Sequence, residues 1–128
     1  MHIARGAVDV RMEIPGAVIR QRRDFGDVSQ YDGISCEFFT LGAGVDTTPL
    51  FQGLDGNACQ CPHWGYVLAG RITTTDAAGV EESVVEGDLF YWPPGHNVRV
   101  VEDSEIIMFS PQDPHSEVID HMIAKVNG

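Results

Sequence analysis

The sequence is poor in basic residues and contains no long apolar run. It carries 8 Lys and Arg against 19 Asp and Glu, which gives a net charge of −11. Such a surface repels the phosphates of nucleic acids and anionic lipids, so we expect no nucleic acid and no membrane among its partners. No apolar run approaches the roughly 20 residues of a membrane span, and Met1–Gly6 lacks the apolar core of a signal peptide. We therefore expect a cytoplasmic protein.

Several catalytic motifs are also missing. The chain has no Gly-x-Ser-x-Gly elbow, no phosphate-binding glycine loop and no pair of carboxylates framed by apolar strands. These absences leave hydrolase, kinase and glycosidase functions without support. Cysteine is scarce, with 3 residues. An odd number of cysteines without a secretory signal favours free thiols or metal ligands over a disulfide framework.

Short segments with strand patterns fill most of the chain. At 128 residues the sequence is sized for a single domain, 1–128. Alternation of apolar and polar residues, bounded by turn residues, predicts strands. The predicted strands span 8–14, 17–20, 35–41, 59–68, 71–75, 81–85, 89–92, 97–101 and 105–109. Short strands at close, even spacing predict an all-β sandwich or barrel. Residues 42–58 show no periodicity and are expected to form a long loop that acts as a lid or wraps over a neighbour.

The last segment has a different pattern. Apolar residues recur there at helical spacing, at Val118, Ile119, Met122, Ile123 and Val126. They follow Pro114, and Ser116 can serve as an N-cap, so the pattern predicts a short amphipathic C-terminal helix. The apolar stripe of this helix must be covered by the rest of the domain or by a second subunit.

The stretch from Cys59 to His96 carries residues that suggest a family. Tyr66-Val67-Leu68-Ala69-Gly70 is followed by a hairpin, by Gly87-Asp88 and by Pro93-Pro94-Gly95. The spacing of these glycines and prolines resembles the two motifs of the cupin superfamily of small β-barrels. The resemblance covers about 58–110 and implies an all-β, cupin-like jelly-roll β-barrel with a short C-terminal α-helix.

The family's usual metal ligands, three histidines and one glutamate, are not found at the matching positions. His63, seven residues before Gly70, stands at the position of the glutamate, and Cys59 stands at that of the second histidine. The position of the first histidine falls on Asn57. In the second motif, the histidine position falls on Val98 and the asparagine position on Glu102.

A different set of ligands remains. If 59–67 forms one strand, Cys59, Cys61 and His63 point to the same face, which in a cupin is the barrel interior. His96 lies beside the Pro-Gly corner and can reach the barrel mouth. Two thiolates and two imidazoles suit zinc, or iron or copper with an open position. The sequence therefore predicts a divalent metal ion, zinc or iron, held by Cys59, Cys61, His63 and His96.

Each of these residues also has a purely structural interpretation. Buried cysteines often act as small hydrophobic residues, His63 can be a core histidine, and His96 can face solvent at a turn. His115 and His121 are expected on a solvated face of the C-terminal tail.

Trp64 and Tyr66 have the outward parity of an interface, which, with the amphipathic tail, predicts a homodimer. 

Three functions are therefore open. The first is a barrel that binds a small-molecule ligand over a metal site, and the family resemblance implies oxidoreductase or isomerase activity for such a site. The second is a metal-free, non-catalytic module that binds or senses a ligand in the same cavity. In the third, the candidate site residues are only core and the domain serves assembly.

Overall fold

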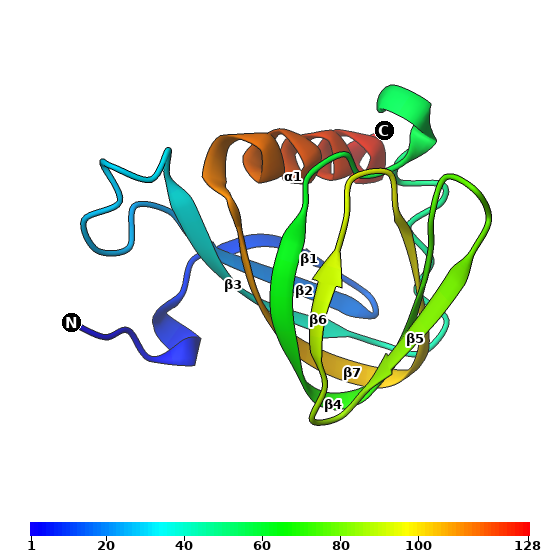
Figure 1. Cartoon of the computed structure of the whole chain (residues 1–128), viewed down its shortest axis with the longest axis horizontal. Helices are drawn as coiled ribbons and strands as arrows, with labels where there is room; N and C mark the ends of the chain where they lie inside the picture. Colours follow the sequence, from blue (N-terminus) through cyan, green and yellow to red (C-terminus); the bar gives the residue numbers. More distant parts are fainter.

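The structure, a computed structural model, describes residues 1–128 and is a β-barrel with one helix across its end (Figure 1). The strands and the helix are β1 (Val10–Ile14), β2 (Ala17–Arg22), β3 (Ile34–Leu41), β4 (His63–Thr75), β5 (Glu81–Val85), β6 (Leu89–Trp92), β7 (Asn97–Pro111) and α1 (Gln112–Asn127). Two short 3-10 helices lie at Arg5–Ala7 and Asp55–Asn57. The expected all-β architecture with a C-terminal helix is confirmed.

The two longest strands organise the barrel. The strands pair antiparallel in the order β1-β2-β3-β7-β4-β5, and β6 pairs with β4. The first part of β4 pairs with β6 and its last part with β5, while β7 lies along its other edge. Strand β7 pairs with β3 and with β4, and β4 in turn pairs with both β6 and β5 along one edge. Because these long strands connect all the others, the sheet curls around an interior.

Part of the loop 42–58 completes the barrel wall. Backbone N–H groups of Gly44 and Thr47 donate to the carbonyls of Val100 and Val98, each at 2.9 Å, so the loop runs along the free edge of β7. Phe51 is buried in the core. This loop therefore acts as wall rather than as a separate lid.

The turn predicted at Ala69-Gly70 is instead a bend within one strand. Gly70 has a φ of +95°, and the β4–β7 register shifts on both sides of Ala69. A bulge of this kind bends a strand without ending it, so β4 continues to Thr75. The turn predicted at 102–104 is likewise absent, because β7 runs unbroken from Asn97 to Pro111.

Helix α1 starts earlier than the sequence predicted. It begins at Gln112, so Pro114 lies in the first turn, where its missing N–H has no intrahelical acceptor to lose. Ser116 is not the N-cap, because it lies inside the helix and Pro111 occupies the cap position, and the Ser116 hydroxyl donates to the carbonyl of Gln112 at 2.8 Å. The buried face of α1 comprises Gln112, His115, Ser116, Val118, Ile119 and Met122.

The core lies between the curled sheet and α1. Alternate residues of β2 and β3 are buried, as the period of a strand with one covered face requires. Val67, Ile72 and Ile119 are fully buried, and they join β4 to the helix within one cluster of 20 residues. No helix in the structure has the length and apolar character needed to cross a membrane.

Candidate functional site

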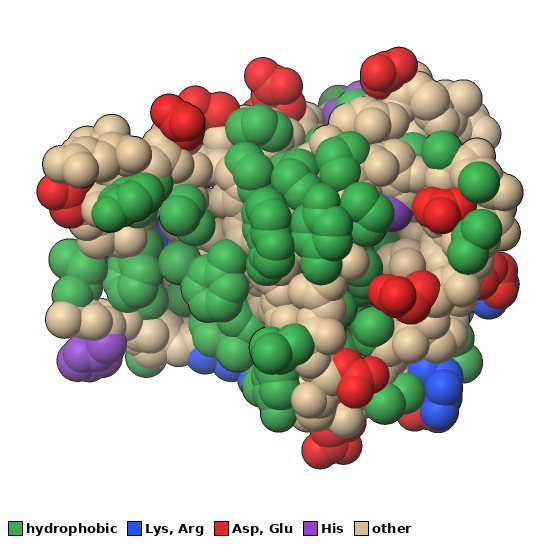
Figure 2. Space-filling model, in the orientation of Figure 1, with side chains coloured by type: hydrophobic (Ala, Val, Ile, Leu, Met, Phe, Trp, Pro, Cys, Tyr) green, Lys and Arg blue, Asp and Glu red, His purple; other side chains and the backbone are tan.

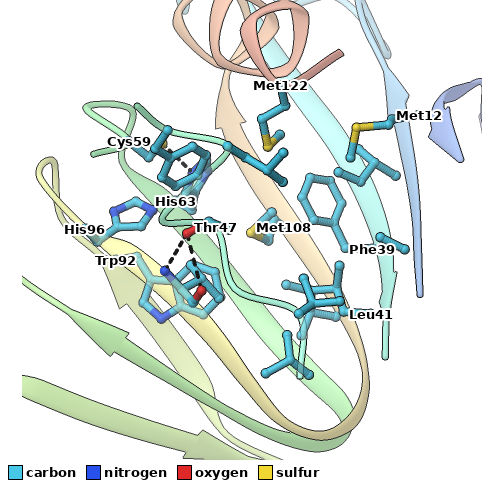
Figure 3. Close-up of a pocket in the computed structure, with 18 of the residues that line it drawn as sticks. Met12, Phe39, Leu41, Thr47, Cys59, His63, Trp92, His96, Met108 and Met122 are labelled. Atoms are coloured by element: carbon cyan, nitrogen blue, oxygen red, sulfur yellow. Dashed lines mark hydrogen bonds between the residues drawn. The ribbon is translucent and has the colours of Figure 1, made fainter. Parts of the chain in front are cut away.

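A largely apolar cavity lies inside the barrel beneath α1. The cavity has a volume of about 60 Å³, and 16 of its 20 lining residues are hydrophobic. Figure 3 shows Met12, Phe39 and Leu41 at one end and Cys59, His63 and His96 at the other. No Lys, Arg, Asp or Glu lines the cavity.

Cys59, His63 and His96 form a compact group of donors in the cavity wall. One ligand atom from each of them lies within 4.8 Å of the others, and all three residues are buried. Cys59 Sγ is 3.5 Å from His63 Nε2. His63 is the first residue of β4, while Cys59 and His96 pair as an isolated antiparallel bridge with a 2.9 Å hydrogen bond from Cys59 N to His96 O. Backbone pairing therefore holds the three donors together.

The protons of both imidazoles are fixed away from Cys59. His96 Nδ1–H donates to the carbonyl of Pro93 at 2.6 Å. Ser110 Oγ donates to Glu37 Oε1 at 2.7 Å, and it therefore accepts from His63 Nδ1–H, also at 2.7 Å. This arrangement leaves Nε2 of each ring unprotonated, which is the form that binds a metal ion, and the Cys59 thiol is the contact of His63 Nε2.

Burial keeps all three groups uncharged in the protein alone. It raises the pKa of the Cys59 thiol to about 12. Burial, with His115 and His96 nearby, holds the pKa of His63 well below its ordinary value. Burial also lowers the pKa of His96, although its bond to Pro93 opposes the shift. A bound cation would reverse this balance at Cys59, because a metal ligand thiol loses its proton.

A second group, Glu37, His63 and His115, meets behind the first. Glu37 is buried on β3, and its carboxylate accepts hydrogen bonds from four side chains: Ser35, Ser110, Gln21 and His115. Three of these bonds reach Oε2 and the one from Ser110 reaches Oε1, so the carboxylate is held in place and Glu37 is better placed to orient His63 through Ser110 than to bind an ion itself.

The structure does not bring Cys61 into the candidate metal site. Its Sγ donates to the carbonyls of Pro62 and Pro111, at 3.4 and 3.8 Å. The prediction assumed one strand from Cys59, but β4 begins only at His63. Cys61 is buried like Cys59 and His63, as the alternation predicted, but without strand geometry through 59–62 its Sγ is directed at the carbonyls of Pro62 and Pro111 and not at the other donors.

Sequence reasoning missed Glu37 and His115. His115 was expected on a solvated face but is 2% exposed, lines the cavity and binds Glu37 through Nδ1. Both residues carried a signal. Glu37 has the same strand parity as the inward Phe39, and His115 lies three residues before Val118 on the apolar stripe of α1.

Comparison with known proteins identifies the fold. No family model and no curated protein matches the sequence. An RmlC-like cupin from Shewanella frigidimarina is similar in structure, with a TM-score of 0.57, 16% identity, and coverage of 87% of this chain and 90% of that one. The polyketide cyclase RemF from Streptomyces resistomycificus gives a TM-score of 0.56 and 20% identity over 87% of this chain and 78% of that one. KdgF from Halomonas sp. gives a TM-score of 0.52 and 18% identity over 88% of this chain and 94% of that one. With the curled antiparallel sheet, these similarities show that the chain has the fold of the cupin superfamily.

Proposed function

We propose that this protein is a small-molecule-binding cupin barrel in which Cys59, His63 and His96 hold one divalent metal ion. The observation that carries the proposal is the meeting of two unprotonated imidazole nitrogens and one thiol in the wall of an apolar cavity. Three protein ligands with an open fourth position are typical of catalytic zinc sites. Cys61, the fourth ligand that the sequence suggested, lies outside this group of donors.

The donor set favours zinc over the hard cations. One thiolate and two imidazoles are soft or borderline ligands, whereas Mg²⁺ and Ca²⁺ prefer oxygen. Iron is the second choice, since imidazole suits it as well. An ion bound there would act as a Lewis acid on an oxygen atom in the cavity. His63 and His96 would hold it, and Ser110 and Glu37 would fix the orientation of His63.

We further propose that any reaction is an oxidoreductase or isomerase step on a small organic molecule. Structures with this fold include proteins described as a polyketide cyclase and an oxalate decarboxylase, so the fold supports more than one chemistry. 

Elemental analysis of protein purified without a histidine tag tests the metal proposal. We expect close to one metal per chain, lost in Cys59→Ala and His63→Ala and retained in the matched control Cys61→Ala. Because a core substitution can unfold the chain, Cys59→Ser is compared as well, with circular dichroism to verify folding. Cobalt loading adds a direct readout, since a thiolate ligand gives a charge-transfer band that Cys59→Ser would abolish. Folded wild-type protein without metal, even after loading with zinc, would overturn the proposal.

A metal-free binding module is the second candidate function. It is favoured by the Cys59 thiol, which burial holds in its protonated form and which already contacts His63 Nε2 at 3.5 Å. In this case the cavity would bind its ligand without turnover. Ligand-dependent thermal stabilisation of metal-free protein would support this candidate.

We propose a cytoplasmic homodimer as the working form. All three cysteines are free, and two of them are buried without a disulfide, which suits a reducing compartment. Large apolar side chains gather on the outer face of β6, β4 and β7, at Trp64, Tyr66, Leu89, Tyr91 and Phe109. Figure 2 shows a hydrophobic area over these strands with acidic side chains around it. A second copy of this face would cover the patch without bringing acidic groups into its centre.

A further inference from the structure

The polar groups that face the cavity are confined to one end. Thr47 lines the cavity, but its hydroxyl is already used, because it accepts from Val98 N at 2.8 Å and lies 3.3 Å from Val98 O. The remaining polar lining groups are then the histidines, Cys59 and Trp92, whose buried indole N–H has no hydrogen-bond partner. They lie together, because the Trp92 ring is 5.7 Å from that of His96 and 6.3 Å from that of His63 (Figure 3). A ligand that fits these walls therefore has one polar group at this end and an apolar body at the other.

The charges around the candidate metal site leave little attraction for an anion. A divalent ion and the Cys59 thiolate together carry one positive charge. The Glu37 carboxylate lies directly behind them, joined to His63 through Ser110. No arginine or lysine lines the cavity. His115 also lines the cavity, but its Nδ1 already pairs with Glu37. A carboxylate or phosphate ligand would therefore be buried here without an arginine or lysine partner, which is unfavourable in an apolar environment.

The size of the cavity limits the ligand further. A cavity that holds one water molecule needs a volume of about 10–15 Å³ by the same measure. The 60 Å³ available therefore holds roughly four to six water-sized groups. Sugars, nucleotides and fused aromatic rings are larger than this. Met12, Phe39 and Met122, which come from β1, β3 and α1, bound the space.

We infer that the ligand of this cavity is a short, uncharged molecule with one oxygen donor and an aliphatic body, such as a small amide, ketone or alcohol. Its oxygen lies at the end of the cavity formed by Cys59, His63 and His96, and its hydrocarbon part contacts the walls near Phe39 and Leu41. This inference rests on the proposed metal site and adds to it the chemical class of the ligand.

A matched pair of probes tests the inference. Butyramide and butyrate have the same number of non-hydrogen atoms and the same apolar body, but only butyrate is charged. Calorimetric titration of the zinc-loaded protein at neutral pH is expected to show butyramide binding at least tenfold more tightly than butyrate. Octanamide, which has four more carbon atoms, is expected not to bind, because the cavity is too short.

Two matched variants place the binding in the cavity. Ala17 lies in the cavity wall, whereas Ala124 is exposed on α1. Ala17→Leu fills the space and should abolish butyramide binding while zinc stays near one per chain, and Ala124→Leu should change neither quantity. Equal or tighter binding of butyrate at full zinc occupancy would overturn the ligand class alone. A folded wild-type protein that takes up no zinc would instead overturn the proposed function, and this inference with it.

Discussion

Ser110 is the residue that links the candidate metal site to its buried carboxylate. It accepts from His63 Nδ1 and donates to Glu37, at 2.7 Å in both cases. Ser110→Ala would remove the acceptor that fixes the His63 ring, while leaving all three proposed ligands in place. Loss of such a supporting contact typically weakens metal binding about 10- to 100-fold. We expect a loss of this size in zinc affinity, measured by competition with a chelator.

A second serine serves as the control for this prediction. Ser83 is exposed and makes one side-chain hydrogen bond, to Thr73 at 2.7 Å. Ser83→Ala should leave zinc affinity unchanged. Equal affinities for Ser110→Ala and the wild type would show that His63 does not depend on this support, and Glu37 would then have only a structural role.

Two buried neutral histidines make the stability of the metal-free protein dependent on pH. Burial depresses the pKa of His63 and of His96 below the ordinary value of 6.5. Between the folded and unfolded pKa values the unfolded chain binds more protons, so stability falls as the pH drops through 6.5. The expected slope is about 1.4 kcal/mol per pH unit for each histidine that stays neutral.

Urea unfolding of chelator-treated protein between about pH 7.5 and about pH 5.5 measures this slope, because most carboxylates titrate below that range. His96→Asn should reduce the slope, whereas His2→Asn, at an exposed position, should not change it. A flat stability profile across this window would mean that the two histidines bind protons equally in the folded and the unfolded chain, so that burial does not depress their pKa values.

At the residue scale the sequence predicted part of the candidate site. His63 and His96 were found because they lie in recognisable strand and corner patterns, and Cys59 because it lies near them. Glu37 and His115 could not be joined to them from spacing alone. Their contact depends on α1 packing across the end of the barrel, which brings together residues 78 positions apart. Such long-range packing is not encoded in any local pattern.

At the scale of single elements, Gly70 allows β4 to remain one strand. Its φ is +95°, and an added Cβ would lie 2.3 Å from the carbonyl oxygen of Asp103 and 2.2 Å from Ser104 Oγ. Gly70→Ala therefore combines backbone strain with a steric clash against β7. We expect a loss of about 3–5 kcal/mol in the free energy of unfolding, measured by urea denaturation.

Gly87 provides the matched control, because its φ is +92° but nothing lies within 4 Å of an added Cβ. Gly87→Ala should cost only the backbone strain, about 1–2 kcal/mol. Equal losses at the two positions would show that the close approach of β4 to β7 does not constrain Gly70.

The bend at Gly70 also explains which boundaries the sequence could predict. Gly87 and Pro93-Pro94-Gly95 do end strands, and β5 and β6 have the predicted bounds. Gly70 and the polar stretch 102–104 have the composition of turns but lie inside long strands. A glycine with positive φ serves a turn or a bulge equally well. The pairing of β4 with β7 decides between them, and this pairing is again long-range.

For the whole molecule, the proposed dimer sets apolar burial against charge repulsion. Each chain carries a net charge of −11, so two chains repel each other. The patch of Trp64, Tyr66, Leu89, Tyr91 and Phe109 contains no charge. Raising the ionic strength from about 0.01 to about 0.1 M shortens the screening length from about 30 to about 10 Å. Salt should therefore tighten the dimer, in contrast to one held by ion pairs, and sedimentation equilibrium would measure the change.

Leu89 is the most direct position at which to disrupt this dimer. It is 83% exposed on β6, and Leu89→Glu would place a carboxylate within the patch without disturbing the core. Burying that charge without a partner is unfavourable, so the variant should be monomeric at concentrations where the wild type is dimeric. Val80→Glu adds the same charge at a 62% exposed position in the turn between β4 and β5 and should remain dimeric. If both variants dimerise like the wild type, the chains pair through another surface. A wild type that is monomeric at all concentrations would contradict the dimer itself and leave the aromatic face free in solution.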